Sequence, residues 1–197
     1  MRIDSTAAAI LAGGRARRLG GRDKSRLLVE GLPIIIRQVE VLQLVASRLF
    51  VVGSGPERFA DLSLPVYADR IGGAGALGGI YTALEIADRE FVLTVACDLP
   101  FLEAPLLGRL VEMAAGVRDG AWIRTPRGVE PLIACYRRGA RERIRGQIEA
   151  GRLKAADLAA VLDVAEMDLG EVARYGSPAR LLANVNTPDD YVQYRRS

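Results

Sequence analysis

The hydrophobic and polar positions of the chain fall into two alternating kinds of segment. Short, almost uninterrupted apolar runs bounded by Gly, Pro or Asp are typical of buried strands, and they occur at 7–11, 49–52, 64–68, 91–96, 121–124 and 131–136. Stretches with apolar residues at helical spacing lie between them, at about 33–47, 79–88, 104–115 and 139–150. Strands that alternate with helices favour an α/β sheet covered by helices on both faces.

Two proline positions mark expected helix starts. Pro33 suits the first position of the helix at 33–47, where its missing N–H leaves no hydrogen bond unmade. Thr187, followed by Pro188 and two aspartates, has the cap, the first residue and the acidic first turn of another helix. The chain shows no repeat, no low-complexity stretch and no linker, and its 197 residues suit a single domain.

The composition is that of an ordinary globular protein. Half of the residues are hydrophobic and 26% are charged, which excludes intrinsic disorder. No apolar run approaches the roughly 18 residues that span a bilayer. The apolar stretch at 7–12 is too short for a secretory signal, and basic residues follow it instead of preceding it. We therefore expect a cytoplasmic protein without a membrane segment.

Residue types that are rare or missing narrow the chemistry. The chain has no histidine, which excludes Ser-His and Cys-His nucleophiles and His-ligated zinc. Two cysteines, Cys97 and Cys135, are too few for a metal cage, and a disulfide between them is not expected in a reducing compartment. The net charge of +3 favours an anionic partner. Nucleic acid, a phosphorylated small molecule and an acidic protein all fit that charge.

A glycine-rich basic loop follows the first expected strand. The strand end and the loop contain Leu11, Ala12, Gly13, Gly14, Arg18 and Lys24. Glycines let backbone N–H groups converge, and cations add charge, so the loop suits a polyphosphate. It is not a P-loop, because Asp23 stands where that motif requires Gly. Lys24 is one of only two lysines among 27 basic residues. The alternative is a solvated basic loop.

Two carboxylates follow expected strands. Asp98 comes directly after the run at 91–96, so it should lie at the carboxyl edge of the sheet, in the same crevice as the basic loop. One or two carboxylates together with phosphate oxygens commonly hold Mg²⁺. Asp69 follows another short strand and is a candidate companion. The alternative for Asp98 is a cap of the turn that it makes with Pro100.

Asn184 and Asn186 are the only asparagines of the chain. Residues two apart on an extended segment point to the same side, so both amides could reach one ligand or the water shell of a metal. An Asx turn before the helix at Pro188 is an equally good interpretation.

Two further patterns compete with these candidates. Residues 73–78 fit G-x-G-x-x-G, with Asp98 twenty positions after the last glycine, as in a dinucleotide fingerprint. Four residues separate that motif from the preceding strand, whereas the fingerprint needs the strand to run directly into the turn.

The segment 137–154 carries seven positive charges. It is either a solvated helix face or a grip for a second anionic substrate or an acidic partner, and it lacks the interleaved aromatic residues of single-strand nucleic-acid binders.

These motifs resemble, in order, the signature of the molybdenum cofactor guanylyltransferases. The similar segments are Leu11-Ala12-Gly13-Gly14, Arg18-Leu19-Gly20, Asp23-Lys24, Gly31-Leu32-Pro33, Gly75-Ala76-Leu77-Gly78-Gly79-Ile80, Ala96-Cys97-Asp98-Leu99-Pro100 and Asn184-Val185-Asn186-Thr187-Pro188. Ala16, Leu19, Gly53-Ser54 and Ala76 depart from the usual pattern. The Gly13-Gly14 pair resembles guanylyl enzymes, whereas cytidylyl relatives tend to have Ala-Gly.

The resemblance implies a single Rossmann-like three-layer domain with a mostly parallel central sheet. It implies a nucleotide-binding part at about 1–103 and an acceptor-binding part at about 104–197. By position, Leu11, Ala12, Gly13, Gly14 and Asp69 would bind nucleotide, Arg18 and Lys24 would contact phosphates, Asp98 would bind Mg²⁺, and Asn184 and Asn186 would support the site.

The implied reaction is Mg²⁺-dependent transfer of GMP from GTP to the phosphate of molybdenum-molybdopterin, with release of pyrophosphate. Such transfer needs alignment and charge neutralisation and no protein nucleophile, so the lack of histidine is no obstacle. Other cofactor-assembly proteins are candidate partners, and neither nucleic acid nor a membrane is expected. Four alternatives stay open: cytidylyl transfer to the same cofactor, another NTP:phosphate nucleotidyltransferase, an NAD-binding oxidoreductase and a non-catalytic nucleic-acid binder.

Overall fold

The structure is a computed structural model that describes residues 3–13, 23–185 and 190. Three of the candidate site residues, Gly14, Arg18 and Asn186, lie outside the described residues, and so does the helix start expected at Thr187. Predictions about these positions therefore stay predictions.

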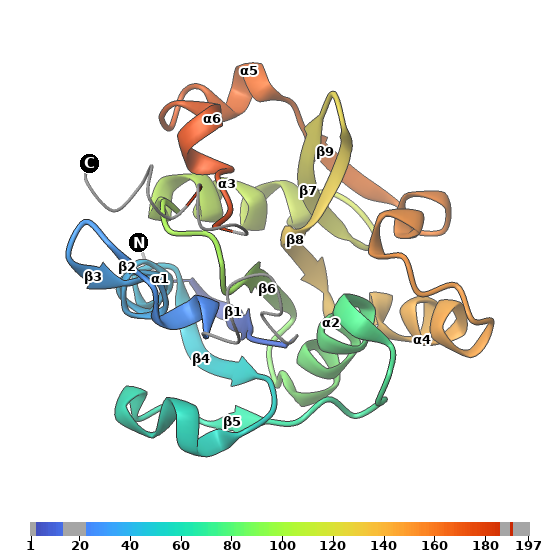
Figure 1. The fold of residues 1–197 in the computed structure, drawn as a ribbon. Coiled ribbons are helices and arrows are strands. Elements are labelled where there is room, and N and C mark those ends of the chain that lie inside the picture. Colours follow the sequence, from blue (N-terminus) through green and yellow to red (C-terminus); the bar gives the residue numbers. More distant parts are fainter. Residues whose placement is uncertain (1–2, 14–22, 186–189, 191–197) are drawn as a thin grey trace.

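A seven-stranded sheet forms the centre of the described fold (Figure 1), with the strand order β5-β4-β1-β6-β8-β7-β9. The strands are β5 (Val66–Tyr67), β4 (Ala46–Val52), β1 (Ile3–Leu11), β6 (Phe91–Ala96), β8 (Gly128–Arg137), β7 (Gly120–Thr125) and β9 (Val164–Met167). All neighbouring pairs are parallel except β6–β8 and β8–β7. Within the described sheet, β8 therefore runs against the other strands, and the predicted mostly parallel sheet is confirmed.

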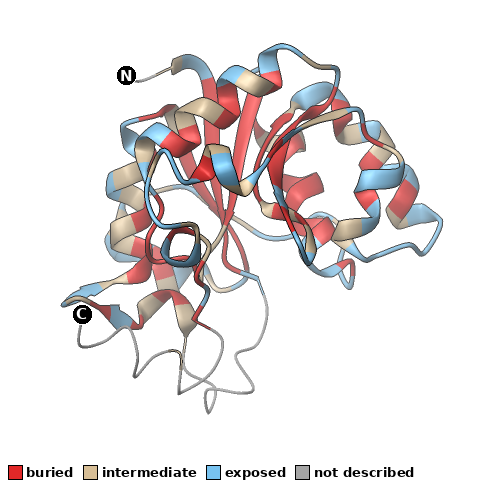
Figure 2. Cartoon of the chain, turned by 90° about the horizontal axis from the view of Figure 1, so that it is seen from above, coloured by how far each residue is buried: buried red, intermediate tan, exposed pale blue. Residues whose placement is uncertain are grey.

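Helices cover both faces of the sheet, and β1 is therefore buried on both sides. Its alternate residues Ala8 and Ile10 belong to one apolar cluster, whereas Ala7 and Ala9 belong to another. The first cluster includes side chains of α1 (Ile34–Gln43), α3 (Ala104–Ala115), α5 (Leu169–Val172) and α6 (Pro178–Leu181). The second includes those of α2 (Gly75–Ile86) and α4 (Arg141–Glu149). Figure 2 shows the buried strands between these layers, and the predicted three-layer α/β architecture is confirmed.

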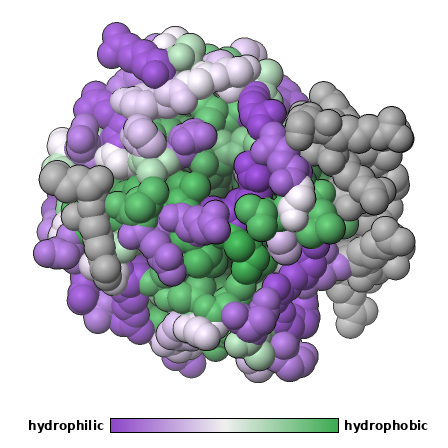
Figure 3. All heavy atoms as spheres, turned by 90° about the vertical axis from the view of Figure 1, so that its left-hand side faces the viewer, coloured by the Kyte–Doolittle hydropathy of each residue, from purple (hydrophilic) through white to green (hydrophobic). Residues whose placement is uncertain are grey.

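Shorter elements connect these layers. They are the hairpin strands β2 (Leu28–Val29) and β3 (Leu32–Pro33) and the 3-10 turns η2 (Lys24–Arg26), η3 (Pro56–Leu62), η4 (Arg138–Ala140) and η5 (Ala155–Ala160). Figure 3 shows the side of the molecule that carries β2 and β3, where apolar side chains gather between polar ones. Leu28, Leu32 and Leu44 are exposed hydrophobic residues. Among the described residues, no helix is both long and apolar enough to cross a membrane.

Element boundaries correct the sequence analysis in several places. Pro33 is not the first helical residue: it belongs to β3 and caps α1 with extended backbone angles, so the helix begins at Ile34. The helix ends at Gln43 and not near Ser47, because Ala46 already pairs with Ile3 in the sheet. The second helix begins at Gly75 instead of Gly79, and the strand expected at 64–68 contains only Val66–Tyr67.

Candidate active site

A cavity of about 1070 Å³ opens at the carboxyl edge of the parallel strands. Strands β1, β4 and β6 end at its walls, the first turn of α2 and the start of β8 contribute to it, and so does the segment after α6. Small-molecule pockets usually measure about 300–1,000 Å³, so this cavity is at the upper end of that range and suits a large ligand. Its place is the one where open α/β sheets bind ligands.

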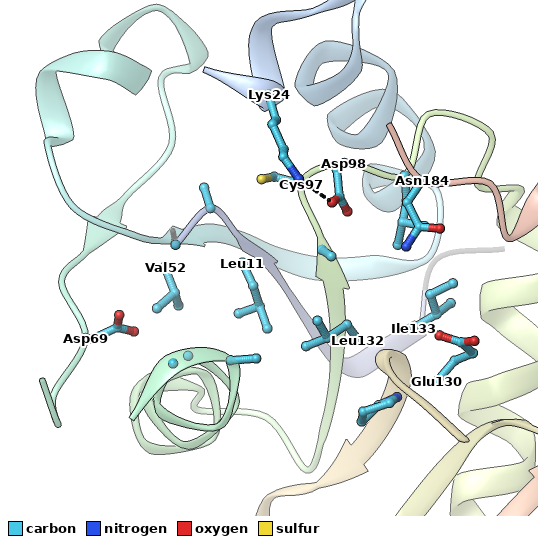
Figure 4. Close-up of a pocket in the computed structure, with 18 of the residues that line it drawn as sticks. Leu11, Lys24, Val52, Asp69, Cys97, Asp98, Glu130, Leu132, Ile133 and Asn184 are labelled. Atoms are coloured by element: carbon cyan, nitrogen blue, oxygen red, sulfur yellow. Dashed lines mark hydrogen bonds and ion pairs between the residues drawn. The ribbon is translucent and has the colours of Figure 1, made fainter. Parts of the chain in front are cut away.

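Lys24 and Asp98 meet at one wall of this cavity, between its two ends (Figure 4). The Lys24 Nζ atom lies 3.5 Å from Asp98 Oδ2, and the two side chains are 24% and 16% exposed. Burial raises the pKa of Asp98, and the positive charge of Lys24 opposes that shift. The loop residue and the strand-end residue that the sequence placed in one crevice therefore share one wall of the cavity.

The turn that presents Asp98 is held by hydrogen bonds from distant parts of the chain. Gln38 of α1 is 1% exposed, and its Nε2 atom donates to the carbonyl oxygens of Ala96 at 2.7 Å and Leu99 at 3.0 Å. The backbone N–H of Val185 donates to the carbonyl oxygen of Asp98 at 2.9 Å. The turn around Asp98 is thus fixed from two sides before any ligand arrives.

Cys97 lies beside Asp98 in the cavity wall, but its thiol is not a nucleophile. Burial, and then the negative charge of Asp98, raise the pKa of Cys97 to about 12. The thiolate is the reactive form of cysteine, so Cys97 stays an uncharged wall residue. Cys135 is buried and reduced, and no disulfide joins the two.

Lys24 is positioned by a short turn whose anchor was not apparent in the sequence. Asp23 caps η2 by accepting a hydrogen bond from the N–H of Ser25 at 3.1 Å. Arg58 donates to Asp23 Oδ2 from Nε at 3.0 Å and from Nη2 at 2.7 Å. Burial alone would raise the pKa of Asp23, but the hydrogen bonds from Ser25 and Arg58 lower it. Asp23 is therefore an ionised support for the loop end that carries Lys24.

The opposite side of the cavity is formed by the ends of β1 and β4 and by Asp69. A Cβ atom at Gly13 would lie 3.9 Å from Asp69 Oδ2, which places the carboxylate next to Gly13. Figure 4 shows Asp69 across the cavity from Asp98, so the two do not form the carboxylate pair that the sequence analysis considered. Leu11 and Ala12, at the end of β1, also line the cavity.

Gly53, at the turn after β4, allows a close approach of two strands. A Cβ atom there would lie 2.9 Å from the carbonyl oxygen of Ala12, which is closer than side-chain carbons come. The Gly53-Ser54 departure from the family pattern thus has a packing reason in this chain, and Ser54 lines the cavity.

The remaining side of the cavity is formed by Asn184 and by the start of β8. Asn184 was predicted as a site residue, and the residues of β8 were not. Asn184 lines the cavity near Asp98. Glu130, Pro131, Leu132 and Ile133, from the start of β8, line it as well. They were missed because an apolar run does not reveal the direction of its strand, and only the reversed direction of β8 brings its first residues to this edge.

The residues present fit a shared Mg²⁺ site and not a self-contained metal cage. Within the part of the chain that the structure describes, no three His, Cys, Asp or Glu side chains gather around one point. Asp98 is a single carboxylate in a cavity with room for phosphates. That donor set matches the way proteins usually bind Mg²⁺, through one or two carboxylates together with substrate phosphate oxygens.

The structure bears on two interpretations that the sequence left open. They are the dinucleotide fingerprint at 73–78 and the role of the basic segment at 137–154. The glycines do not follow a strand directly, because β5 ends at Tyr67 and α2 begins only at Gly75. The basic segment is largely neutralised by neighbours: Arg137 pairs with Glu90, Arg143 with Asp119 and Arg145 with Glu149. The structure therefore favours the solvated-face interpretation of that segment.

Comparisons with known proteins agree with the fold and identify the family. The family model described as the MobA-like NTP transferase domain matches residues 8–164. A probable molybdenum cofactor guanylyltransferase of Carboxydothermus hydrogenoformans is 36% identical over 183 residues, which cover 93% of this chain and 91% of the relative. Its counterpart in Pelotomaculum thermopropionicum is 34% identical over 187 residues, with coverages of 94% and 90%.

A solved structure extends the comparison to the fold. The molybdopterin-guanine dinucleotide biosynthesis protein A of Archaeoglobus fulgidus matches 96% of each chain with a TM-score of 0.80 at 24% identity. Nucleotidyl transfer and not dinucleotide-dependent oxidation is thus the chemistry of the relatives, and the fingerprint interpretation of residues 73–78 is wrong. The matched length, the fold and the cavity at the strand ends lead to one conclusion: the chain is a nucleotidyltransferase that belongs to the MobA-like NTP transferase family.

Proposed function

We propose that this chain transfers GMP from GTP to the terminal phosphate of molybdenum-molybdopterin, forming the guanine dinucleotide and pyrophosphate. One observation carries the proposal: Lys24 and Asp98 lie 3.5 Å apart in a large cavity at the carboxyl edge of the parallel strands. The names of the relatives supply the identity of donor and acceptor.

The two sides of the cavity divide between donor and acceptor. Leu11, Ala12, Gly13 and Asp69 would hold GTP on one side, with Gly14 and Arg18 of the same loop as further contacts. The start of β8 and Asn184, with Asn186, would hold the acceptor on the other side. This division corresponds to a nucleotide-binding part at about 1–103 and an acceptor-binding part at about 104–197 of one domain.

The reaction makes one phosphorus–oxygen bond and breaks another. An oxygen of the acceptor phosphate attacks the α-phosphorus of GTP, and the bond from that phosphorus to the bridging oxygen of the β-phosphate breaks, so pyrophosphate leaves. The attacking oxygen is already ionised, and no side chain has to remove a proton. The chain's lack of histidine is compatible with this chemistry.

The side chains act by position and charge. Lys24 lies where its ammonium group can neutralise charge on the phosphates, and such preorganised charge commonly contributes a factor of about 10²–10³ in rate. Mg²⁺, bound by Asp98 and phosphate oxygens, would withdraw electron density from the α-phosphate. Gln38 and the backbone N–H of Val185 hold the turn at Asp98, and Arg58 holds Asp23 beside Lys24. The protein thus acts as a template that aligns two phosphates.

Thermal unfolding with nucleotides tests the donor half of the proposal. GTP, CTP, ATP and NAD would each be added with and without Mg²⁺. A ligand at 100 times its dissociation constant stabilises a protein by about 2.7 kcal/mol, which corresponds to roughly 5–10 °C at this chain length. We expect that shift with GTP and Mg²⁺, and a much smaller one in Lys24→Met.

Lys154→Met is the matched control, because Lys154 is the other lysine of the chain and is exposed outside the cavity. A preference for CTP would keep the mechanism and replace guanylyl by cytidylyl transfer. Stabilisation by NAD alone would contradict the proposal. Docking to other cofactor-assembly proteins is part of the same proposal, and co-purification with such a protein tests it.

A further inference from the structure

The reversed direction of β8 brings a carboxylate to the acceptor side of the cavity. β8 pairs antiparallel with β6, and Ile133 lies opposite Val95 near the end of that strand. On its other side the register with β7 shifts, so that Trp122 faces Ala134 but the next residue, Ile123, faces Glu130. Residues 131–133 therefore bulge between the two registers, and Glu130 reaches the cavity at the strand edge.

Glu130 differs from most glutamates of this arginine-rich chain. Glu30, Glu90, Glu149, Glu166 and Glu171 each pair with an arginine, whereas no ion pair of Glu130 is found within the described residues. Burial raises the pKa of Glu130, while the charge of Arg127 and a hydrogen bond with Thr125 partly oppose the shift. The carboxylate is half-buried beside the cavity without the partner that would compensate it fully.

The position of Glu130 separates it from the donor side. Figure 4 shows Glu130 and Asn184 on one side of the cavity and Asp69 on the other, with Lys24 and Asp98 between the two sides. A nucleotide whose base lies by Asp69 and Gly13 and whose phosphates lie by Lys24 would leave Glu130 to the second substrate. Leu132 and Ile133 next to it offer apolar surface to a flat ring.

The chemistry of a carboxylate identifies the part of the acceptor that it would bind. An ionised carboxylate only accepts hydrogen bonds, and its two oxygens match two adjacent N–H groups. The pterin ring of molybdopterin has such an edge, formed by its ring N–H and its 2-amino group. We propose, on the basis of the function proposed above, that Glu130 recognises this amino-pyrimidinone edge and thereby selects the acceptor.

Steady-state kinetics of Glu130→Gln test the assignment. The substitution keeps the size of the side chain and replaces one acceptor oxygen by an N–H donor. With GTP saturating and molybdenum-molybdopterin varied, we expect the KM for the acceptor to rise at least tenfold, which is about 1.4 kcal/mol, with kcat within about threefold of the parent chain. The affinity for GTP should not change. Glu112→Gln, at an exposed position of α3 outside the cavity, should behave like the parent chain.

A binding comparison gives a second readout. 6-Hydroxymethylpterin has the 2-amino group, whereas 6-hydroxymethyllumazine has an oxygen in its place. The parent chain should bind the pterin more tightly, and Glu130→Gln should lose or reverse that preference. An unchanged acceptor KM together with an unchanged preference would overturn the assignment, as would a loss of GTP affinity alone. A parent chain that makes no dinucleotide from GTP would instead overturn the proposed function.

Discussion

Gln38 should be needed for activity although it touches no substrate. Its amide nitrogen binds the carbonyl oxygens of Ala96 and Leu99, the residues that flank the Cys97-Asp98 turn. Gln38→Met keeps the length of the side chain and removes both hydrogen bonds. The change therefore frees the Asp98 turn from α1 and leaves two buried carbonyl groups without this donor.

The expected loss of stability follows from counting buried polar groups. Each carbonyl oxygen left without a donor costs about 1–3 kcal/mol. The Oε1 atom of Gln38 is itself buried without a partner. Gln38→Met removes this atom, and the free energy gained offsets the cost of about one of the two carbonyl oxygens. The net destabilisation should be about 1–3 kcal/mol. At this chain length, that lowers the unfolding midpoint by about 2–12 °C, and the variant stays folded at the assay temperature.

Activity should fall further than this stability change explains. A small displacement of a catalytic group can cost about 10²-fold in rate, so we expect kcat/KM of Gln38→Met to fall by about 10- to 100-fold. Gln43→Met, at an exposed position of the same helix, is the matched control and should retain the parent rate.

Gln38→Glu separates positioning from general loss of structure. A glutamic acid side chain can donate to one of the two carbonyl groups only when it is protonated. Its activity relative to the parent chain should therefore rise as the pH is lowered, while that of Gln38→Met stays level. Parent-like rates in both variants, or a ratio that does not change with pH, would refute the reasoning.

Three further predictions follow from other parts of the site and fold. Asp98→Asn and Lys24→Met should each lose about 10²- to 10³-fold in kcat, measured as pyrophosphate release, and a folded Asp98→Asn with normal turnover would contradict the metal assignment. Burial raises the pKa of Asp98 above its ordinary value of 3.8, so the folded state binds the proton more tightly than the unfolded chain. The contribution of Asp98 to the free energy of unfolding is fully present below pH 3.8 and is lost as the pH rises through the pKa of Asp98 in the folded state. Asp98→Asn without ligand should therefore unfold at a higher temperature than the parent chain at about pH 7 but not at about pH 3. Gly120→Ala should destabilise strongly, because φ is +152° there and a Cβ atom would lie 2.9 Å from the Cα atom of Tyr136; an unchanged midpoint in calorimetry would contradict this.

The order of strands and helices could be predicted because the apolar runs are short and well bounded. The strand Phe91–Ala96 and the helix Ala104–Ala115 have the predicted limits. The position of Asp98 followed from the same pattern, since a residue just after a buried parallel strand lies at the ligand-binding edge. Lys24 was conspicuous because arginine supplies almost all other positive charge.

The parts that escaped prediction depend on contacts between distant residues. The reversed direction of β8 is not encoded in its apolar run, so Glu130 gave no signal. The support of Asp23 by Arg58 joins residues 35 positions apart. Gln38 did give a signal, because it lies four residues after Ile34 and four before Leu42 on the buried face of α1. A polar residue on such a face usually has a buried partner, and here the partner is the turn at Asp98.

The decisive measurement follows the α-phosphate of the nucleotide. GTP labelled at that phosphate is incubated with the protein, Mg²⁺ and molybdenum-molybdopterin, and the same is done with labelled CTP. We expect the label of GTP to appear in a guanine dinucleotide, with one pyrophosphate released per dinucleotide and none without the acceptor. Label that enters a product only from CTP, or no labelled dinucleotide from either nucleotide, would contradict guanylyl transfer at the Lys24–Asp98 site.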